Sequence, residues 1–142
     1  MTTMNRTAIA AALLSLLVTS CTGGNAPTTP TASITSNQIA STATLKIVSP
    51  KDGQVVHGST VDVKVDLEHA KIVPVTTTNI QPDEGHLHII LDDQLLTMTA
   101  SEDQKVPNIS PGTHLLKVEF VAGNHLPFDP PIIDEVGFKV IA

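Results

Sequence analysis

The sequence predicts an all-β fold for most of this 142-residue chain. In residues 44–142, apolar and polar residues alternate with a period of two in several short runs, as they do in half-buried strands. Turns rich in Pro, Gly and Asp separate these runs, and no segment has the period of an amphipathic helix. About seven such strands within roughly 100 residues are typical of an immunoglobulin-like β-sandwich. We therefore expect one domain of this class.

The strands follow one another at short intervals. The predicted strands cover residues 44–50, 55–58, 59–68, 85–93, 94–100, 105–109, 113–121 and 136–142. Pro50 ends the first strand, and residues 55–58 are expected to extend this first edge. The run 59–68 alternates most clearly, with its core-facing residues expected to be Val61, Val63, Val65 and Leu67. Residues 85–93 are the most apolar, which predicts a central strand that ends in an acidic turn.

His114 lies next to a turn that is typical of immunoglobulin-like domains. The sequence SPGTHLLKVEF at 110–120 contains a Pro-Gly turn that leads into a strand. In immunoglobulin-like domains a tyrosine at the start of the corresponding strand caps the corner of the sandwich through a backbone hydrogen bond. His114 occupies this place, and the chain has no Tyr or Trp. We therefore predict a structural role for His114.

The N-terminus has the pattern of a lipoprotein leader. Residues 8–18 are an apolar run that is too short to span a bilayer and has the length of a signal-peptide core. Arg6 precedes this run, and Ser20 directly precedes Cys21, as in the bacterial lipobox. We expect residues 1–20 to be the signal peptide and Cys21 to be acylated. The lone Cys excludes an internal disulfide and a Cys-based zinc cluster.

A polar segment separates this leader from the domain. Residues 21–43 are rich in Ser and Thr and carry no charge, which predicts a flexible tether. In an alternative interpretation, Ile34 and Ile39 open a first strand. The folded domain is expected to span 44–142. This organisation predicts a protein whose lipid anchors it in the bacterial envelope. It would face the periplasm from the outer membrane of a two-membrane bacterium, or otherwise lie on the outer face of the plasma membrane.

Composition excludes several functions. With 8 Lys and Arg against 14 Asp and Glu, the formal net charge is −6, which argues against binding to nucleic acid. Three Phe and no other aromatic residue leave no stacking platform for bases or sugars. The chain lacks a nucleophile motif such as Gly-x-Ser-x-Gly, and its adjacent acidic pairs point apart. No catalytic residue is predicted, and we do not expect an enzyme.

Three of the six histidines form a candidate site. His86 and His88 lie on the same side of a strand, about 7 Å apart, where both can reach one ion. The favoured register turns Leu87 inward and the two histidines outward, and the opposite register buries them. His125 lies in the segment 121–131, which is expected to be a loop stiffened by its prolines. If the strands pair as in an immunoglobulin domain, this loop lies at the same end as His86.

These residues predict a metal site. Imidazoles suit copper and zinc, so His86, His88 and His125 are the candidate ligands, with Asp83, Glu84 or Asp129 as candidate carboxylates. In the opposing interpretation, the same histidines only tie the loop to the sheet by hydrogen bonds. His57 and His69 are expected to be ordinary surface residues.

The order of these motifs resembles that of an uncharacterised bacterial family of small secreted or lipid-anchored domains. That family shows a Gly-His-x-His strand, a Pro-Gly-x-His turn and an Asn-His-x-Pro loop before a Pro-Pro pair. The matching positions are 85–93, 110–114 and 124–131, and the resemblance covers about 45–142. It implies a periplasmic or surface immunoglobulin-like domain without a known activity. Leu87 stands where many relatives carry a third His.

Two functions follow from the sequence. In the first, the protein is a non-catalytic, lipid-anchored envelope protein whose domain has a structural or binding role, with the membrane and another envelope protein as partners. In the second, it is a periplasmic module that binds copper or zinc through His86, His88 and His125. No other cofactor is expected.

Overall fold

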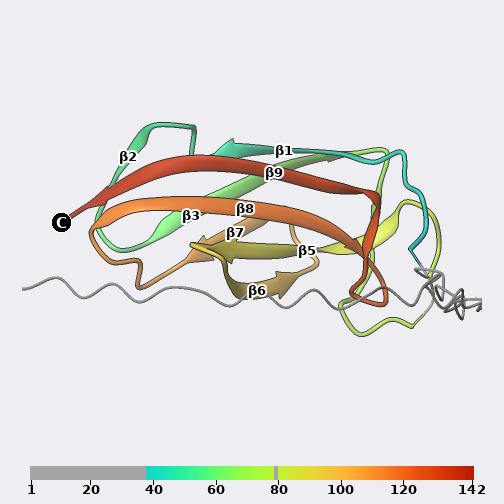
Figure 1. The fold of residues 1–142 in the computed structure, drawn as a ribbon. Helices are drawn as coiled ribbons and strands as arrows, with labels where there is room; N and C mark the ends of the chain where they lie inside the picture. The colour runs from blue at the N-terminus through green and yellow to red at the C-terminus, as the bar shows by residue number, and fades with distance from the viewer. Residues whose placement is uncertain (1–37, 79) are drawn as a thin grey trace, which may run out of the picture. The chain divides into compact units, whose positions relative to one another are not determined.

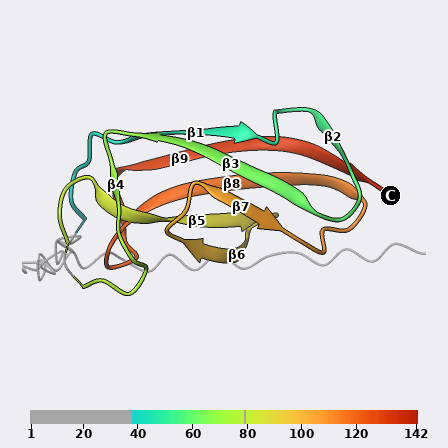
Figure 2. The same cartoon turned by 180° about the vertical axis from the view of Figure 1, so that it is seen from behind.

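The computed structural model describes residues 38–78 and 80–142, which form two β-sheets that pack against each other (Figures 1 and 2). The predicted signal peptide, Cys21 and residues 22–37 of the predicted tether lie outside the described residues. Within the described part, no helix is long and apolar enough to cross a membrane. The described residues belong to one compact unit with a single apolar core.

The smaller sheet has three antiparallel strands in the order β1-β3-β7. Their bounds are β1 (Thr44–Ser49), β3 (Val61–Glu68) and β7 (Asp103–Val106). In β3 the predicted alternation holds, because Val61, Val63 and Val65 are buried and the acidic and basic residues between them are exposed. A strand with one apolar face settles against the opposite sheet in this register only, since a slip of one residue would expose the valines.

The larger sheet has six strands. Its main path runs β2-β9-β8-β5-β4, and β6 pairs with β5 beside this path. The bounds are β2 (Gln54–His57), β4 (Lys71–Ile72), β5 (Glu84–Leu91), β6 (Gln94–Thr99), β8 (Gly112–Ala122) and β9 (Pro127–Ile141). The most apolar strand, β5, is an inner strand, as predicted. Positive φ angles at Asp92 and Asp93 form the tight turn into β6.

The strand order identifies the sandwich as immunoglobulin-like. β1, β3 and β7 correspond to strands A, B and E of such domains, and β9, β8 and β5 correspond to G, F and C. The predicted all-β, immunoglobulin-like sandwich is thus confirmed, with nine strands in the described part instead of about seven. Residues 54–57 do not extend the first edge strand. They pair in parallel with the end of β9 in the other sheet.

The core lies between the two sheets and is almost entirely aliphatic. Phe120 on β8 and Phe128 on β9 stack at its centre with ring centroids 5.3 Å apart, and neither ring is exposed. Around them pack side chains from both inner faces, including Val63, Val65, Leu87, Ile89, Leu116, Val118 and Val140. Burial of such apolar surface is the main force that holds the two sheets together.

The predicted tether ends earlier than residue 43. Ile39 packs against the core, Ala43 is buried, and the amide of Asp129 donates a hydrogen bond to the carbonyl oxygen of Ile39 at 3.0 Å. The Ser41 hydroxyl donates to Asp83 at 2.6 Å. Residues 38–43 therefore line the sandwich, although they form no strand there. Two apolar residues among polar neighbours were too weak a pattern to predict this packing.

The last strand is longer than its sequence suggests. Residues 127–131 belong to β9, so the connection after β8 shrinks from the predicted loop at 121–131 to residues 123–126. Phe128 explains the difference because its ring is fully buried against Phe120 and draws this segment onto the core. The pairing register shifts between Phe120 and Val121, and such an irregularity accommodates proline residues that cannot donate ladder hydrogen bonds.

His114 lies at a corner of the sandwich, at the start of β8. Its Nε2 atom is 2.9 Å from the carbonyl oxygen of Ser110, and its Nδ1 atom is 2.7 Å from a carboxylate oxygen of Asp92. Asp92 also accepts a hydrogen bond from the amide of Leu115. The hydrogen bond to Asp92 raises the pKa of His114, and the same bond lowers the pKa of Asp92.

We expect the substitution His114→Gln to destabilise the domain by about 1 kcal/mol, because it breaks the ion pair at this corner. The raised pKa of His114 makes the charged ring's contribution complete below about pH 6.5, and this contribution is lost as the pH rises through the folded-state pKa. Urea unfolding at pH 6 and at pH 9 measures this difference. Asp92→Asn should change the pH dependence in the same way, and an equal loss at both pH values would contradict the prediction.

Candidate metal site

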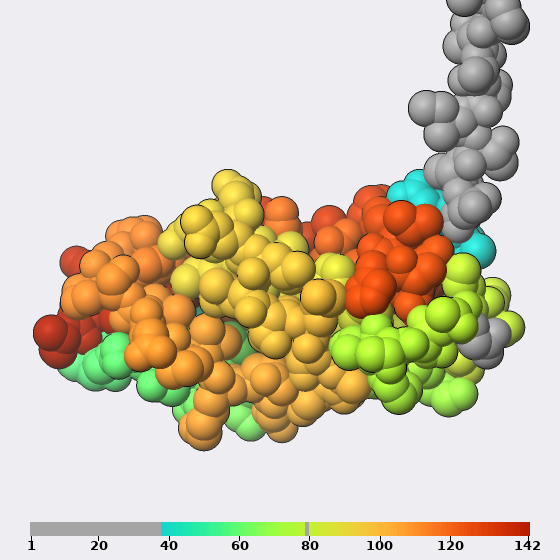
Figure 3. All heavy atoms as spheres, turned by 90° about the horizontal axis from the view of Figure 1, so that it is seen from below, coloured from blue at the N-terminus to red at the C-terminus, as the bar shows by residue number. Residues whose placement is uncertain are grey.

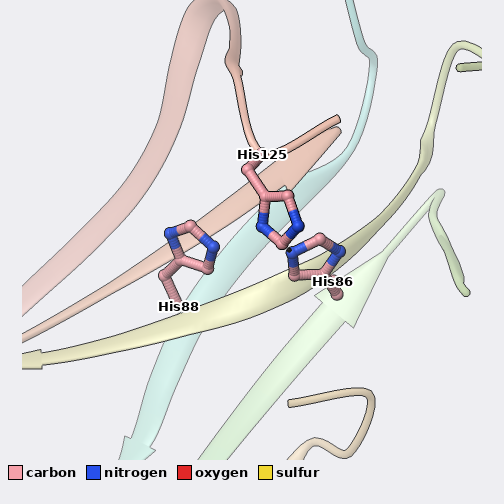
Figure 4. A group of neighbouring side chains, drawn as sticks. All are labelled: His86, His88 and His125. Carbon is pink, nitrogen blue, oxygen red and sulfur yellow. Dashed lines mark hydrogen bonds between the residues drawn. The ribbon is translucent and has the colours of Figure 1, made fainter. Parts of the chain in front are cut away.

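His86 and His88 project from β5 on the outer face of the larger sheet. Their neighbours Leu87 and Ile89 are buried in the core, so the strand adopts the register that the sequence favoured. The expected exposure is wrong for His86, whose exposed fraction is 0 %, whereas His88 is half-buried. The outer face at this end of the sheet is not open, because the turn after β8 lies over it (Figure 4).

A glycine permits the close approach of β8 to the start of β5. Gly85 is paired with Ala122, and a Cβ atom added at Gly85 would lie only 1.9 Å from the carbonyl oxygen of Val121. No residue with a side chain fits there without movement of the backbone. The Gly-His-x-His sequence therefore has a local reason: Gly85 lets the two strands meet, and His86 then lies beside Val121 near the end of β8.

A tight turn places His125 above the sheet. The amide of His125 donates to the carbonyl oxygen of Ala122 at 2.9 Å, and the amide of Ala122 donates to the carbonyl oxygen of Leu126 at 3.0 Å. The side chain of Asn124 accepts from the amide of Leu126. His125 adopts a left-handed backbone conformation with φ of 66°. Residues other than Gly adopt this conformation uncommonly, and His is among the residues that are enriched in it, together with Asn and Asp.

The three imidazoles face one another (Figure 4). The Nε2 atom of His86 is 3.1 Å from the Nδ1 atom of His125, and the ring centroids of His88 lie 5.3 and 5.8 Å from those of His86 and His125. One ligand atom from each residue lies within 4.8 Å of the others, so the group could hold a metal ion. The sequence named these three residues, and the tertiary structure brings them together.

Two ring nitrogens in this cluster lack hydrogen-bond partners. Among the described residues, no group reaches His86 Nδ1 or His88 Nε2, although both atoms are buried. A buried polar atom without a partner costs about 1–3 kcal/mol, so native structures rarely contain one unless it has a further role. The hydrogen bond between His86 and His125 thus gives a partner to His86 Nε2 and His125 Nδ1 and leaves the other two nitrogens without one.

The electrostatics of the site favour neutral imidazoles. Burial lowers the pKa of His86 to about 4, and the neighbouring rings of His125 and His88 add to this effect. Burial also lowers the pKa of His88, with a smaller contribution from His125. The lone pair of a neutral imidazole is the form that binds a metal ion. Both strand histidines are therefore ready to act as ligands at neutral pH.

The carboxylates named from the sequence do not join the cluster. Asp83 accepts hydrogen bonds from Ser41 and the amide of Thr42, which lowers its pKa, and Glu84 pairs with Lys71 at 2.7 Å. Asp129 is not in the group of potential ligands either, which in the described part consists of the three histidines. Each of the first two carboxylates is engaged with a chain segment that the sequence could not place beside it.

Two residues that the sequence analysis missed flank His88. Glu119 on β8 and Met98 on β6 are its direct partners in the two neighbouring strands. Glu119 is half-buried, and burial raises its pKa. The two-residue turn at Asp92 and Asp93 predicts a hairpin. Pairing the residues outward from this turn would have placed a residue close to position 98 opposite His88.

The turn that carries His125 is open to solvent on one side. A shallow hollow of about 340 Å³ lies beside His125, between this turn and the segment 75–78. Figure 3 shows the yellow-green segment that contains residues 71–78 next to the red-orange turn. His125 itself is exposed, so an ion or small ligand can reach the cluster from this side.

Comparisons with known proteins identify similar folds only. No protein family and no curated protein matches this chain. A fibronectin(III)-like module of Clostridium thermocellum CbhA has a TM-score of 0.48 and 15% identity, over 68% of this chain and 93% of the module. The PKD domain of human KIAA0319 has a TM-score of 0.42 and 16% identity, over 83% of this chain and 91% of that domain. These values support no statement about function.

We expect the metal-free domain to lose stability as the pH falls from about 6.5 towards 4. The lowered pKa of His86 means that the unfolded chain binds a proton in this range and the folded chain does not. The loss approaches about 3 kcal/mol, at 1.36 kcal/mol per pKa unit. Chemical unfolding of the wild type and His86→Leu across this range measures it. The gap between the two proteins should change with pH, and a constant gap would contradict the lowered pKa.

Proposed function

We propose that this domain binds copper or zinc with His86, His88 and His125. The observation that carries this proposal is the convergence of one nitrogen from each residue within 4.8 Å. Two of them, His86 Nε2 and His125 Nδ1, are already 3.1 Å apart. Two ligands at about 2.0 Å from a tetrahedral ion are separated by roughly 3.3 Å, so only a small adjustment is needed. The third ligand is the buried Nε2 atom of His88.

A purely structural role for the cluster accounts for fewer of its features. The hydrogen bond between His86 and His125 ties the turn to the sheet, as the alternative interpretation predicted. It leaves His88 Nε2 buried without a partner among the described residues. A metal ion would engage His88 Nε2 and would thereby give this buried atom a partner.

The ligand set favours copper over zinc in affinity. Nitrogen ligands bind divalent copper more tightly than zinc, whatever the protein. Three protein ligands leave one coordination position open, and the exposed side of His125 faces the hollow beside segment 75–78. The proposed role is therefore to bind an ion that has one coordination position left for a further ligand. We propose no catalytic step.

The proposed setting is the bacterial envelope. The signal peptide at 1–20 and the acylated Cys21 would anchor the chain in the membrane, and the polar segment before residue 38 would hold the domain away from it. Attachment of two or more acyl chains gives stable membrane association. Another envelope protein is the partner that we would expect for a domain held at this surface.

We expect micromolar copper(II) or zinc to raise the melting temperature of the domain. At an ion concentration of 100 times the dissociation constant, the stabilisation is about 2.7 kcal/mol, which corresponds to roughly 10–20 °C for a domain of this size. Differential scanning calorimetry with each ion measures this gain. The variant His125→Asn should abolish most of it, because Asn keeps the left-handed turn but removes the imidazole.

The matched control is His69→Asn. His69 is also exposed and also has a positive φ, of 54°, but it lies outside the cluster. This variant should keep the full gain. No gain in the wild type, or an equal loss of the gain in both variants, would refute the metal-binding proposal.

We expect Cys21→Ser to release the protein from the membrane, because the Ser hydroxyl does not replace the thiol that receives the lipid. Incorporation of labelled palmitate and membrane fractionation of the full-length protein, expressed in a bacterium, measure this. The variant should incorporate no label, and His69→Asn should be labelled like the wild type. Acyl chains on the Ser variant would rule out Cys21 as the lipid attachment site.

A further inference from the structure

We infer that Met98 supplies a fourth, thioether ligand to the histidine cluster and that the site therefore takes copper(I). This inference rests on the metal-binding function proposed above and extends it to a particular ion and oxidation state. It arises from the pairing of β5 with β6, which places a sulfur-containing side chain next to one of the three imidazoles.

The pairing puts Met98 and His88 side by side. The two residues are direct partners in the antiparallel ladder between β5 and β6. Cβ atoms of such partners on one face lie about 4.5–5.5 Å apart. The next residue, Thr99, is buried and pairs with the core residue Leu87, so Met98 projects from the opposite, outer face together with His88.

A bulge creates this juxtaposition. The register of the hairpin shifts between Ile89 and Ile90, so the pairs nearest the turn and the pairs farther from it differ by one residue. If the register of the pairs nearest the turn continued along the hairpin without this shift, Thr97 would be the partner of His88. Met98 would then pair with Leu87 and face the core. Bulges commonly re-aim a side chain next to a functional site.

The side chain has the freedom to reach an ion. Met98 is 44% exposed, and a methionine has three rotatable bonds. His88 directs a buried nitrogen towards the cluster, and β6 is paired with the strand that carries His88. Rotation about these bonds would bring the thioether sulfur to the open coordination position of the ion.

The donor set matches copper(I) in charge and softness. A thioether is a soft ligand that selects copper(I), whereas zinc prefers thiolate, imidazole and carboxylate. The three imidazoles are neutral ligands, and the group that they form does not include the carboxylate of Glu119, the other direct partner of His88. Burying a doubly charged ion costs more free energy than burying a singly charged one. Because no anionic ligand in this group offsets that cost, the group favours the singly charged ion.

The sequence offers a clean experiment. Residues 38–142, which share one core, contain a single sulfur atom, that of Met98, because Met1, Met4 and Cys21 all precede them. This segment is titrated with copper(I) under anaerobic conditions against a chromophoric copper(I) chelator, and with zinc in parallel. X-ray absorption of the copper(I)-loaded protein then reports whether sulfur is bound to the metal.

We expect Met98→Leu to weaken copper(I) binding by roughly tenfold or more, which is the loss expected from one good ligand, and to leave zinc binding unchanged. The sulfur signal should be present in the wild type and absent in this variant. Leu95→Ala is the matched control. Leu95 is equally exposed on the same strand and pairs with Ile90, so its loss should change neither affinity.

The outcomes separate this inference from the function on which it rests. Zinc or copper binding that needs His125 but gives no sulfur signal, with equal copper(I) affinities for the wild type and Met98→Leu, would overturn the role of Met98 and leave the metal site intact. A wild-type segment that binds none of these ions would overturn both. A selective loss of copper(I) affinity together with the sulfur signal supports both.

Discussion

The antiparallel pairing of β5 with β8 is the contact on which the candidate site depends. It places Gly85 against the carbonyl oxygen of Val121, at a distance that excludes any side chain, and it puts His86 beside Val121 near the end of β8. The turn that follows β8 then has only residues 123–126 in which to reverse direction, so His125 is held over His86 at 3.1 Å. A side chain at position 85 would separate the strands and with them the histidines.

The larger sheet holds histidines in two opposite electrostatic environments. At one end, burial and mutual repulsion keep His86 and His88 neutral. At the other end, the Asp92 carboxylate favours the charged form of His114, which lies at the sandwich corner where related folds use tyrosine. The same residue type is thus a neutral candidate ligand in one place and a corner residue with a raised pKa in the other. The difference comes from burial at one end and from the hydrogen bond to the Asp92 carboxylate at the other.

Much of the fold follows from local patterns. The alternation in β3 and the register of Leu87 in β5 were predictable because one apolar face must meet the opposite sheet. Residues 38–43 and the start of β9 were not, because their burial depends on single contacts: Ile39 packs on a core that distant strands build, and Phe128 stacks on Phe120. Prolines near Phe128 indicated a loop, and the gain from burying its ring outweighed that local tendency.

The sequence by itself determined that His86 and His88 share one face of a strand, because side chains alternate along any strand. It also indicated that the start of that strand, where His86 lies, would be near the loop of His125. Only the tertiary structure decided that the outer face is covered and that the carboxylates of Asp83 and Glu84 are engaged elsewhere. It alone decided that Met98 stands beside His88, since a one-residue bulge sets that pairing. A bulge depends on how two strands twist against the whole sheet, and no short stretch of sequence encodes that fit.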